Sequence, residues 1–379
     1  MKYVALKDVC KINMGQSPDS SSYNENGEGI PFFQGNADFG ERYPVTRVWC
    51  NAPTKIAQSE DILISVRAPI GALNYAKEKC CIGRGLAAIT PDKSKVSLEF
   101  VYWFLKGKNA ELKSKGTGST FKAISKKILE EILIPDVGFD KQHEYAQMLE
   151  KIYVIIQTRK QELQKLDELI QSRFVEMFGD PVANDKEWTT LPLEEACKTI
   201  VDCPHSTPSY TTENTGFMCI RTSIVKKNKI LWDDIEYIPE DEFIKRIQRK
   251  KPEIGDVVYT REGAILGIAA IIDRECNVAL GQRSMLLSPD ANKCLSEFLC
   301  VAMNCDSFLD NALKGIAGSA SPHINVGDIK SFKMIIPPIE LQNQFADFVV
   351  STDKSKSKIQ KSLQETQLLF DSLMQKYFG

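Results

Sequence analysis

Two stretches of the chain carry apolar side chains at seven-residue intervals. In the first, which has no proline or glycine between residues 142 and 178, they are Leu149, Ile156, Leu163, Ile170 and Met177. In the second they are Val349, Leu363, Phe370 and Tyr377. Strict seven-residue spacing is typical of a left-handed coiled pair of helices. An intermediate stripe, Ile152 and Leu166 in the first stretch and Phe345, Ile359 and Leu373 in the second, is interrupted at Arg159, Arg173, Thr352 and Thr366, and Lys356 interrupts the main stripe of the second stretch. We therefore predict two long helices that pack against each other.

The segments before these helices have a different pattern. Short β-branched runs at residues 61–66 and 255–260 are bounded by polar residues or glycine, as β-strands are. Glycine and proline recur between such runs, where hairpins and turns are expected. Residues 98–105 and 295–310 have the pattern of amphipathic helices. We predict a compact α+β globule before each long helix.

The whole pattern occurs twice, with a period of 200 residues. The segment from Ser172 to Gly179 recurs from Ser372 to Gly379, and Ile134–Pro135 parallels Ile336–Pro337. A duplicated chain of this kind folds as two equivalent halves related by a pseudo-two-fold axis. The two long helices are then antiparallel. The predicted segments are a first globule at 1–138, a central helix at 139–180, a second globule at 181–338 and a C-terminal helix at 339–379.

A pseudo-two-fold protein commonly meets a two-fold partner, and duplex DNA is the commonest one. The charge balance limits this interpretation, because 48 basic and 50 acidic side chains give a formal net charge of −2. A sequence-independent DNA binder relies on excess positive charge. The basic runs at residues 226–227 and 245–251 are local, and the second lies beside the acidic residues 240–242, so it is also readable as a solvated helix face. If DNA is the partner, other subunits are expected to supply much of the phosphate contact.

Composition indicates a protein of the reduced cytoplasm. The hydrophobic share is 43%, no apolar run approaches the length of a membrane span, and the first residues do not resemble a signal peptide. Eleven cysteines are present, and none of them forms a Cys-x-x-Cys pair. We expect these thiols to be unpaired, and those at 294, 300 and 305 to act as small apolar residues on a buried helix.

Signatures of catalysis are missing. The run from Gly116 to Thr120 resembles a phosphate loop, but the lysine precedes it, so it is not a Walker motif. The sequence has no Asn-Pro-Pro-aromatic run to hold a flipped adenine, and no glycine fingerprint for S-adenosylmethionine follows a strand. Cys203 and His205 match no standard zinc spacing. We expect no catalytic residue, no metal and no cofactor in this chain.

The ordered, duplicated motifs strongly resemble the specificity (S) subunits of type I restriction–modification systems over essentially the whole chain. They are the Gly-Ser loops at 118–125 and 318–329, the helix entries at 134–136 and 336–344, and the closing segments at 178–181 and 378–379. The resemblance implies an α+β fold of two tandem α/β target recognition domains separated by two long helices. These helices would form an antiparallel coiled coil with a circular, pseudo-two-fold organisation.

The resemblance also implies partners. Each recognition domain reads one half of a split double-stranded DNA target, and the helices dock two methyltransferase (M) subunits. These carry S-adenosylmethionine and methylate an adenine that is flipped out of the duplex. Restriction (R) subunits complete the complex, and the S subunit itself catalyses nothing. The alternatives are a related modification-only or phage-defence complex, a coiled-coil scaffold that binds proteins, and an enzyme with an unfamiliar site.

Candidate DNA-binding residues are polar side chains in loops, because paired donors and acceptors read base edges and hydroxyls suit phosphates. In the first half they are Gln16, Ser17, Gln34, Asn36, Arg67, Arg84, Ser119 and Lys122. In the second they are His205, Ser206, Thr207, Arg221, Arg261, Gln282, Arg283, Ser319 and His323. For Gln34 to Asn36 a hairpin turn is an equal alternative.

Two pairs among these candidates occupy similar places in the two halves. Arg67 parallels Arg261, and Arg84 nearly parallels Arg283. A shared task for Arg67 and Arg261 is either phosphate contact or a structural salt bridge, since Glu262 adjoins Arg261. The loops around Asn36 and Ser223 have diverged beyond recognition, which predicts an asymmetric bipartite target.

The long helices carry a second set of candidates. Their apolar stripes are expected to pack on each other, and their outer faces and ends are expected to bind the M subunits. The candidate partner contacts are Gln142, Tyr145, Phe174, Phe178, Phe345 and Phe378.

Overall fold

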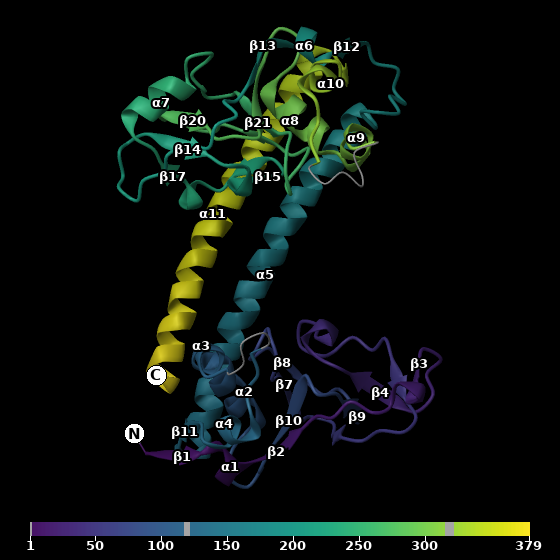
Figure 1. Ribbon diagram of the computed structural model, residues 1–379, viewed down its shortest axis with the longest axis vertical. Coiled ribbons are helices and arrows are strands. Elements are labelled where there is room, and N and C mark those ends of the chain that lie inside the picture. The colour runs from purple at the N-terminus through teal and green to yellow at the C-terminus, as the bar shows by residue number, and fades with distance from the viewer. Residues whose placement is uncertain (1, 117–121, 315–321) are drawn as a thin grey trace. The chain divides into compact units, whose positions relative to one another are not determined.

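A computed structural model describes residues 2–116, 122–314 and 322–379 of the chain (Figure 1). The chain divides into two compact units. Unit 1 comprises residues 1–160 and 361–379, and unit 2 comprises residues 161–360. The boundaries fall inside the two long helices, α5 (Phe139–Phe178) and α11 (Ile339–Phe378). Each unit is therefore a globule together with one half of each long helix.

Unit 1 contains a four-stranded antiparallel sheet in the order β2-β10-β7-β8 and a five-stranded sheet in the order β3-β5-β4-β9-β6. In the second sheet β4 and β9 are parallel. The strands are β1 (Tyr3–Ala5), β2 (Cys10–Met14), β3 (Tyr23–Asn24), β4 (Ile30–Phe33), β5 (Trp49–Cys50), β6 (Ile56–Ala57), β7 (Ile62–Ser65), β8 (Leu73–Tyr75), β9 (Cys80–Ile82), β10 (Leu86–Pro91) and β11 (Leu133–Pro135). The helices before α5 are α1 (Leu6–Val9), α2 (Leu98–Gly107), α3 (Asn109–Ser114) and α4 (Lys126–Glu130).

Unit 2 repeats the central part of this arrangement. Its four-stranded sheet has the order β13-β21-β18-β19, and its three-stranded sheet, β17-β14-β20, again contains a parallel pair. The strands are β12 (Thr190–Pro192), β13 (Cys197–Asp202), β14 (Met218–Ile220), β15 (Val225–Lys226), β16 (Lys229–Ile230), β17 (Glu236–Tyr237), β18 (Val257–Thr260), β19 (Ala269–Ile271), β20 (Val278–Leu280), β21 (Ser284–Pro289) and β22 (Lys333–Ile335). The helices before α11 are α6 (Leu193–Ala196), α7 (Glu240–Arg246), α8 (Ser296–Asn304), α9 (Asp306–Ala312) and α10 (Val326–Lys330).

One expected helix is broken. Residues 295–310 form α8 and α9, because Cys305 between them has extended backbone angles (φ −60°, ψ 138°). The thiols of Cys294, Cys300 and Cys305 are buried, as the sequence suggested, although only Cys300 lies within a helix. All eleven cysteines are unpaired. None of the helices in the described part of the chain has the length and apolarity that crossing a membrane requires.

The C-terminal part of α11 completes the core of unit 1. Phe378 packs against Phe100 and Phe104 of α2, with ring centroids 5.4 and 5.8 Å apart. Tyr377 stacks on Tyr145 of α5 at 3.9 Å, and Phe370, which comes earlier in α11, meets Trp103 of α2 at 5.7 Å. The late part of α11 thus lies along the early part of α5, so the two segments run antiparallel within the unit.

In unit 2 the roles of the helices are exchanged. Phe174 and Phe178, from the end of α5, pack against Phe298 of α8 and Phe345 of α11, with centroids 4.9 to 5.6 Å apart. All four rings are fully buried. Burying one such ring is worth roughly 1.5 to 3 kcal/mol. The end of one half's helix therefore fills the core of the other half's globule.

Three of the five polar residues that interrupt the seven-residue pattern, Arg159, Thr366 and Lys356, make contacts between the long helices. Within unit 1, Arg159 of α5 donates to the carbonyl of Ser362 (2.7 Å) and to the hydroxyl of Thr366 on α11. Within unit 2, Lys356 of α11 pairs with Asp167 of α5 at 2.7 Å. These hydrogen bonds and ion pairs are directional, so they fix the register of the two helix segments within each unit.

A buried glutamine anchors the start of each long helix. The Gln142 side chain accepts a hydrogen bond from the Ser97 amide (2.8 Å) and donates to the Val137 carbonyl (2.8 Å). Gln342 makes the equivalent bonds to the Leu295 amide (2.9 Å) and the Pro337 carbonyl (2.9 Å). An amide buried with its partners in place costs little, whereas an unsatisfied one costs about 1 to 3 kcal/mol. These two residues therefore hold each helix onto its own globule.

This arrangement predicts that a fragment comprising residues 1–180 dimerises. The fragment lacks the α11 segment that covers α2, and it exposes the apolar end of α5 that α11 and α8 cover in the intact chain. A second copy of the fragment can satisfy both surfaces by placing Phe178 where Phe378 lies. Sedimentation equilibrium should show a dimer, and Phe178→Asp should make the fragment monomeric or unfolded. Val175→Asp, at a position 48% exposed, is the control and should leave the dimer intact. A well-folded monomeric fragment would contradict this view of the helices.

Candidate nucleic-acid interface

Three loops of unit 1 meet at one end of its sheets. They follow β2, follow β4 and connect β9 to β10. The Gly15 amide donates to the Leu86 carbonyl (2.9 Å), and the Gly83 amide donates to the Phe33 carbonyl (2.8 Å). The Arg84 amide lies 3.4 Å from the Ser17 hydroxyl. These bonds bring together three of the predicted DNA-binding residues, Ser17, Gln34 and Arg84.

Unit 2 has the same three loops. The Cys203 amide donates to the Ser284 carbonyl (3.2 Å), and the Gly281 amide donates to the Ile220 carbonyl (2.8 Å). The Thr207 hydroxyl lies 3.3 Å from the Gln282 side-chain oxygen. Five predicted residues gather here: His205, Ser206, Thr207, Arg221 and Gln282.

A glycine permits the close approach of two loops in each unit. A Cβ on Gly83 would lie 3.0 Å from the Cα of Gln34, and one on Gly281 would lie 3.0 Å from the Ile220 carbonyl oxygen. Both distances are shorter than ordinary van der Waals contact, so a side chain would push the loops apart. The polar residues after β4 and β14 consequently lie directly beside the β9–β10 and β20–β21 turns.

Strand register shows which residues are equivalent. Phe33 pairs with Ile82 as Ile220 pairs with Leu280, so Gln34 corresponds to Arg221. The bonds of Gly83 and Gly281 to equivalent carbonyls make Arg84 the counterpart of Gln282. The bonds of Gly15 and Cys203 make Ser17 the counterpart of His205. Each unit thus presents one residue from each loop, Ser17, Gln34 and Arg84 in unit 1 and His205, Arg221 and Gln282 in unit 2. We call these two sets the loop triplets.

The equivalence inferred from sequence for Arg67 and Arg261 is wrong by one residue, whereas Arg84 and Arg283 nearly match, with an offset of one residue. The Val66 amide bonds to Gly85 as the Arg261 amide bonds to Arg283, so Arg261 corresponds to Val66 and Arg283 to Gly85. Arg67 corresponds to Glu262, since these two form bridges to Ala123 and His323. Arg67 is exposed, whereas Arg261 is only 6% exposed. A shared task for Arg67 and Arg261 is therefore excluded by their surroundings.

Arg261 forms the structural salt bridge that was one of its two expected roles, but with a different partner. Its Nε donates to the Asp202 carboxylate at 2.9 Å, and its Nη2 lies 3.4 Å from His205 Nδ1. The Nε2 atom of the exposed His205 ring lies 3.1 Å from the same carboxylate. Arg261 is therefore corrected from a DNA contact to a buried support, and it holds Asp202 and His205 in place.

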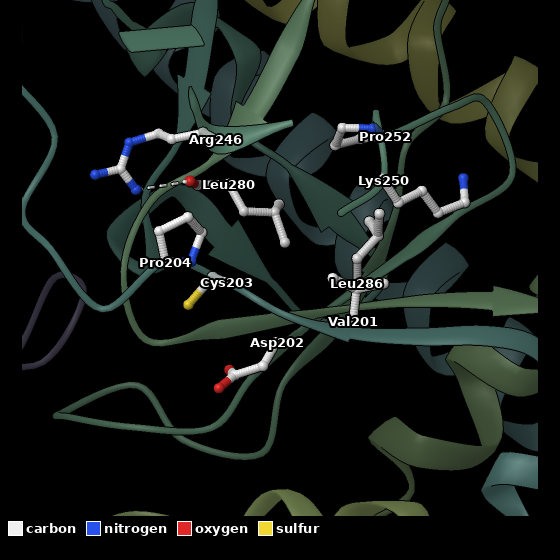
Figure 2. Close-up of a pocket in the computed structure, with 9 residues that line it drawn as sticks. All are labelled: Val201, Asp202, Cys203, Pro204, Arg246, Lys250, Pro252, Leu280 and Leu286. Atoms are coloured by element: carbon white, nitrogen blue, oxygen red, sulfur yellow. Dashed lines mark hydrogen bonds between the residues drawn. The ribbon is translucent and has the colours of Figure 1, made fainter. Parts of the chain in front are cut away.

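Arg246 also supports the loop that carries His205. Arg246, whose side chain is 1% exposed, donates to the Ser206 carbonyl (2.7 Å), the Leu280 carbonyl (3.3 Å) and Glu242 (2.7 Å). Figure 2 shows Arg246 at one side of a hollow that Cys203, Pro204 and Lys250 also line. Lys250 pairs with Asp256 at 2.7 Å. The charged groups that line the hollow are therefore paired within the chain. Arg246 supports the His205 loop, and its hydrogen bond occupies the Ser206 carbonyl.

Arg221 is half-exposed and oriented by two neighbours. Its Nη1 donates to the Glu236 carboxylate, and its guanidinium carbon lies 5.5 Å from the centroid of the Tyr210 ring. Hydrogen bonding to Glu236 raises the pKa of Arg221. Burial raises the pKa of the Tyr210 phenol, which therefore stays neutral. The Arg221 side chain is thus charged and directed, and 42% of it remains exposed.

Gln34 to Asn36 form a capped turn. The amides of Gln34 and Gly35 donate to the Asp38 carboxylate at 2.7 and 3.2 Å, and Asn36 begins a short 3-10 helix that ends at Asp38. The turn is not the hairpin that was the alternative expectation. Its backbone is committed to Asp38, while the Gln34 side chain is exposed.

The remaining candidates divide into two groups, exposed residues and residues outside the described part of the chain. Gln16, Lys122, Arg283 and His323 are exposed; Lys122 adjoins Ala123, which bridges to Arg67, and His323 itself bridges to Glu262. Arg283 has a left-handed backbone (φ 74°) that is uncommon for a side-chain-bearing residue. Ser119 and Ser319, with the Gly-Ser loops that contain them, lie outside the described residues.

The basic run in unit 2 is not a free phosphate-binding patch. Lys245 pairs with Asp241, Lys250 with Glu253 and Asp256, and Arg249 donates to the Asp202 carbonyl. Lys227, in the other run, pairs with Asp306. These contacts favour the solvated, ion-paired alternative for residues 245–251.

Most predicted partner contacts on the long helices are corrected by burial. Gln142 is 3% exposed, Phe174, Phe178 and Phe345 are fully buried, and Phe378 is 2% exposed. They form the unit cores described above, and so they present no surface to another subunit. Tyr145 is half-buried and stacked on Tyr377.

Four residues that support the interface were missed in the sequence: Asp202, Tyr210, Glu236 and Arg246. Tyr210 and Glu236 lie 11 and 15 residues from Arg221, and Arg246 lies 40 residues from Ser206, so no local spacing pattern marked them. Asp202 and His205 are three residues apart, which was the one signal available. In the described part of the chain, no group of three or more His, Cys, Asp or Glu side chains is arranged to hold a metal ion.

The duplicated globules and their matching loops define a protein of tandem recognition-type domains. The family model described as the type I restriction modification DNA specificity domain matches residues 1–168 and 185–367, so the chain belongs to this family.

Three comparisons extend this assignment. The putative type I restriction enzyme MjaX specificity subunit of Methanocaldococcus jannaschii is 47% identical over 41% of this chain, which spans only 37% of that relative. The MjaIX specificity subunit of the same organism is 23% identical over 98% of this chain and 91% of its own length. The crystal structure of a type I restriction–modification S subunit from M. genitalium has a TM-score of 0.58 at 16% identity, over 100% of this chain and 96% of that one. That last likeness shows the fold alone.

The buried pair Asp202–Arg261 gives a prediction for stability. Arg261→Val should lower the free energy of unfolding of unit 2 by on the order of 3 kcal/mol, because it leaves a largely buried carboxylate without its guanidinium. The double substitution Asp202→Met with Arg261→Val reproduces Met14 and Val66 of unit 1 and should cost much less. Urea unfolding of the three proteins measures both effects. Equal losses for the single and double variants would show that the pair does not act as a unit.

Proposed function

We propose that this protein is the DNA specificity subunit of a type I restriction–modification complex, in which each unit reads one half of a bipartite duplex target. The observation that carries the proposal is the pair of loop triplets. The two units place three residues at equivalent positions on the same framework, yet the residues differ at every position. Two recognition modules with different targets require the same framework with different exposed polar residues. The two units have this combination.

The chemistry of the triplets suits base reading. Arginine pairs with the O6 and N7 atoms of guanine, and glutamine pairs with the N6 and N7 atoms of adenine. Unit 1 offers Gln34 and Arg84, whereas unit 2 offers Arg221 and Gln282. The order of arginine and glutamine is reversed between the units, which supports an asymmetric target.

The charge of the chain limits what it does alone. A net charge of −2 supplies no general attraction for DNA, and the basic run of residues 245–251 is paired internally. We infer that partner subunits provide much of the phosphate contact and that this chain provides the sequence information.

The same reasoning assigns catalysis to the partners. We propose that the chain is not an enzyme and that S-adenosylmethionine is bound by the methyltransferase (M) subunits. Restriction (R) subunits would join through the assembled complex. The unpaired cysteines are consistent with the cytoplasm as the compartment.

We propose that α5 and α11 form an antiparallel coiled coil whose outer face docks two M subunits. Support comes from a pair of exposed leucines 200 residues apart, Leu169 on α5 (47% exposed) and Leu369 on α11 (51% exposed). Leu368 beside the second is 70% exposed. Large apolar side chains at equivalent exposed positions fit two copies of one partner.

The test of the proposed function is the methylation pattern of DNA. The chain should be produced with the methyltransferase encoded beside it and allowed to methylate a library of random duplexes. A single split, non-palindromic adenine-methylation motif is expected. Sequence-independent methylation, or a motif that does not change when the chain is exchanged for a relative, would contradict the proposal. Cleavage on addition of the R subunit would separate restriction from a modification-only complex.

The docking surface gives a separate prediction. Leu169→Ser and Leu369→Ser should each reduce the methyltransferase content of the complex from two copies towards one, because each removes apolar contact at one site. Native mass spectrometry measures the ratio. Gln364→Ser, at an exposed polar position of α11, is the matched control and should retain two copies. Two copies bound by both leucine variants would place the docking surface elsewhere.

A further inference from the structure

Arg221 differs from the other exposed arginines in and near the loop triplets, because neighbouring side chains hold its guanidinium in place. Its side chain follows β14 directly, so a rigid strand fixes its Cα. Glu236 begins β17, which pairs with β14 in the same sheet. The carboxylate that binds Arg221 Nη1 is thus itself on a neighbouring strand, and Tyr210 covers one face of the guanidinium.

The bond to Glu236 uses only part of the guanidinium. Within the described residues Nη1 is the engaged atom, so Nε and Nη2 remain to donate. The second oxygen of Glu236 is buried without a hydrogen-bond partner in that part of the chain. A carboxylate that served only to neutralise the arginine would be expected to bind it through both oxygens. The observed contact instead engages a single nitrogen of the guanidinium, and 42% of the Arg221 side chain is exposed.

We propose that Arg221 reads a guanine in the half of the target recognised by unit 2, and that Glu236 is its positioning residue. This inference rests on the proposed function. Guanine presents two acceptors, O6 and N7, in the major groove, and two parallel N–H donors of an arginine match them. A guanidinium held in place before binding loses less conformational entropy when it binds, so the contact discriminates more strongly.

The equivalent position in unit 1 supplies the contrast. Gln34 has the same place on its framework, beside the glycine turn between β9 and β10, but no carboxylate is bonded to its side chain in the described structure. The pairing of Glu236 with Arg221 is therefore a feature of unit 2. It accompanies the arginine and is not required by the shared fold.

The experiment uses the intact complex of this chain with its methyltransferase, acting on the random duplex library. Arg221→Lys keeps the positive charge but removes the fork. We expect the preference for guanine at one position of one half-site to fall by about 10-fold or more, in line with the cost of losing a bidentate base contact. The other half-site should be unchanged. If Arg221 contacts a phosphate, the lysine variant will keep every base preference, and the proposal is overturned.

Glu236→Gln tests the positioning role. It should weaken the preference for the same guanine while leaving the other positions of the motif intact. A residue with a purely structural role would lower methylation of all sequences together, and that result would overturn the role of Glu236. Arg274→Gln is the matched control, since Arg274 also pairs with an acidic residue, Asp273, and covers an aromatic ring, Trp232. It follows β19, at the opposite end of the strands, and should leave the motif unchanged.

Arg221→Gln reproduces the residue at the equivalent position of unit 1. It should replace the guanine preference by one for adenine or by none, in the same half-site. A shift in the other half-site would overturn the assignment. If the wild-type complex yields no sequence motif, the proposed function itself fails. A clear wild-type motif that survives all three substitutions defeats only this inference.

Discussion

Neither globule can close its core with contiguous residues, and this constraint shapes the protein. Phe378, at the end of the chain, is buried against α2 of unit 1, while Phe178, in the middle of the chain, is buried against α8 of unit 2. Each unit is completed by a helix end that the other half supplies. Because burying each such ring is worth roughly 1.5 to 3 kcal/mol, we expect either globule to depend for its stability on the antiparallel association of α5 and α11 within it.

This constraint explains where the two halves are alike. The helix ends, the buried glutamines at positions 142 and 342 and the strand register must remain compatible with both globules. The loops at the ends of the sheets carry no such obligation, because their side chains contact solvent. The framework can therefore remain repeated while Ser17, Gln34 and Arg84 differ from His205, Arg221 and Gln282.

The two units also support their loops by different physical means. In unit 1 the positions beneath the first loop are Met14 and Val66, which stabilise it through apolar packing. In unit 2 the same positions are Asp202 and Arg261, which form an ion pair beside His205. An ion pair with little exposure is a poor source of stability, but it fixes direction. The ion pair of Asp202 and Arg261 thus lies in unit 2, the unit whose loop triplet contains His205.

The sequence by itself determined the repeat, the two long helices and the α+β character of the globules, because these depend on periodic patterns that are visible locally. It also indicated which polar residues lie in loops, since polar positions beside strand ends are visible in the sequence pattern, and their role in DNA binding stays a prediction. Only the tertiary structure showed which loop residues of unit 1 are equivalent to which loop residues of unit 2. The off-by-one equivalence of Arg67 and Arg261 arose because two short apolar strands can be aligned at either of two neighbouring offsets until their hydrogen-bonded register is known. Burial of Phe174, Phe178 and Phe345 was likewise hidden, because an aromatic residue at a helix end looks the same whether it meets a core or a partner. The supports Glu236 and Arg246 became apparent only where the fold brought distant segments together.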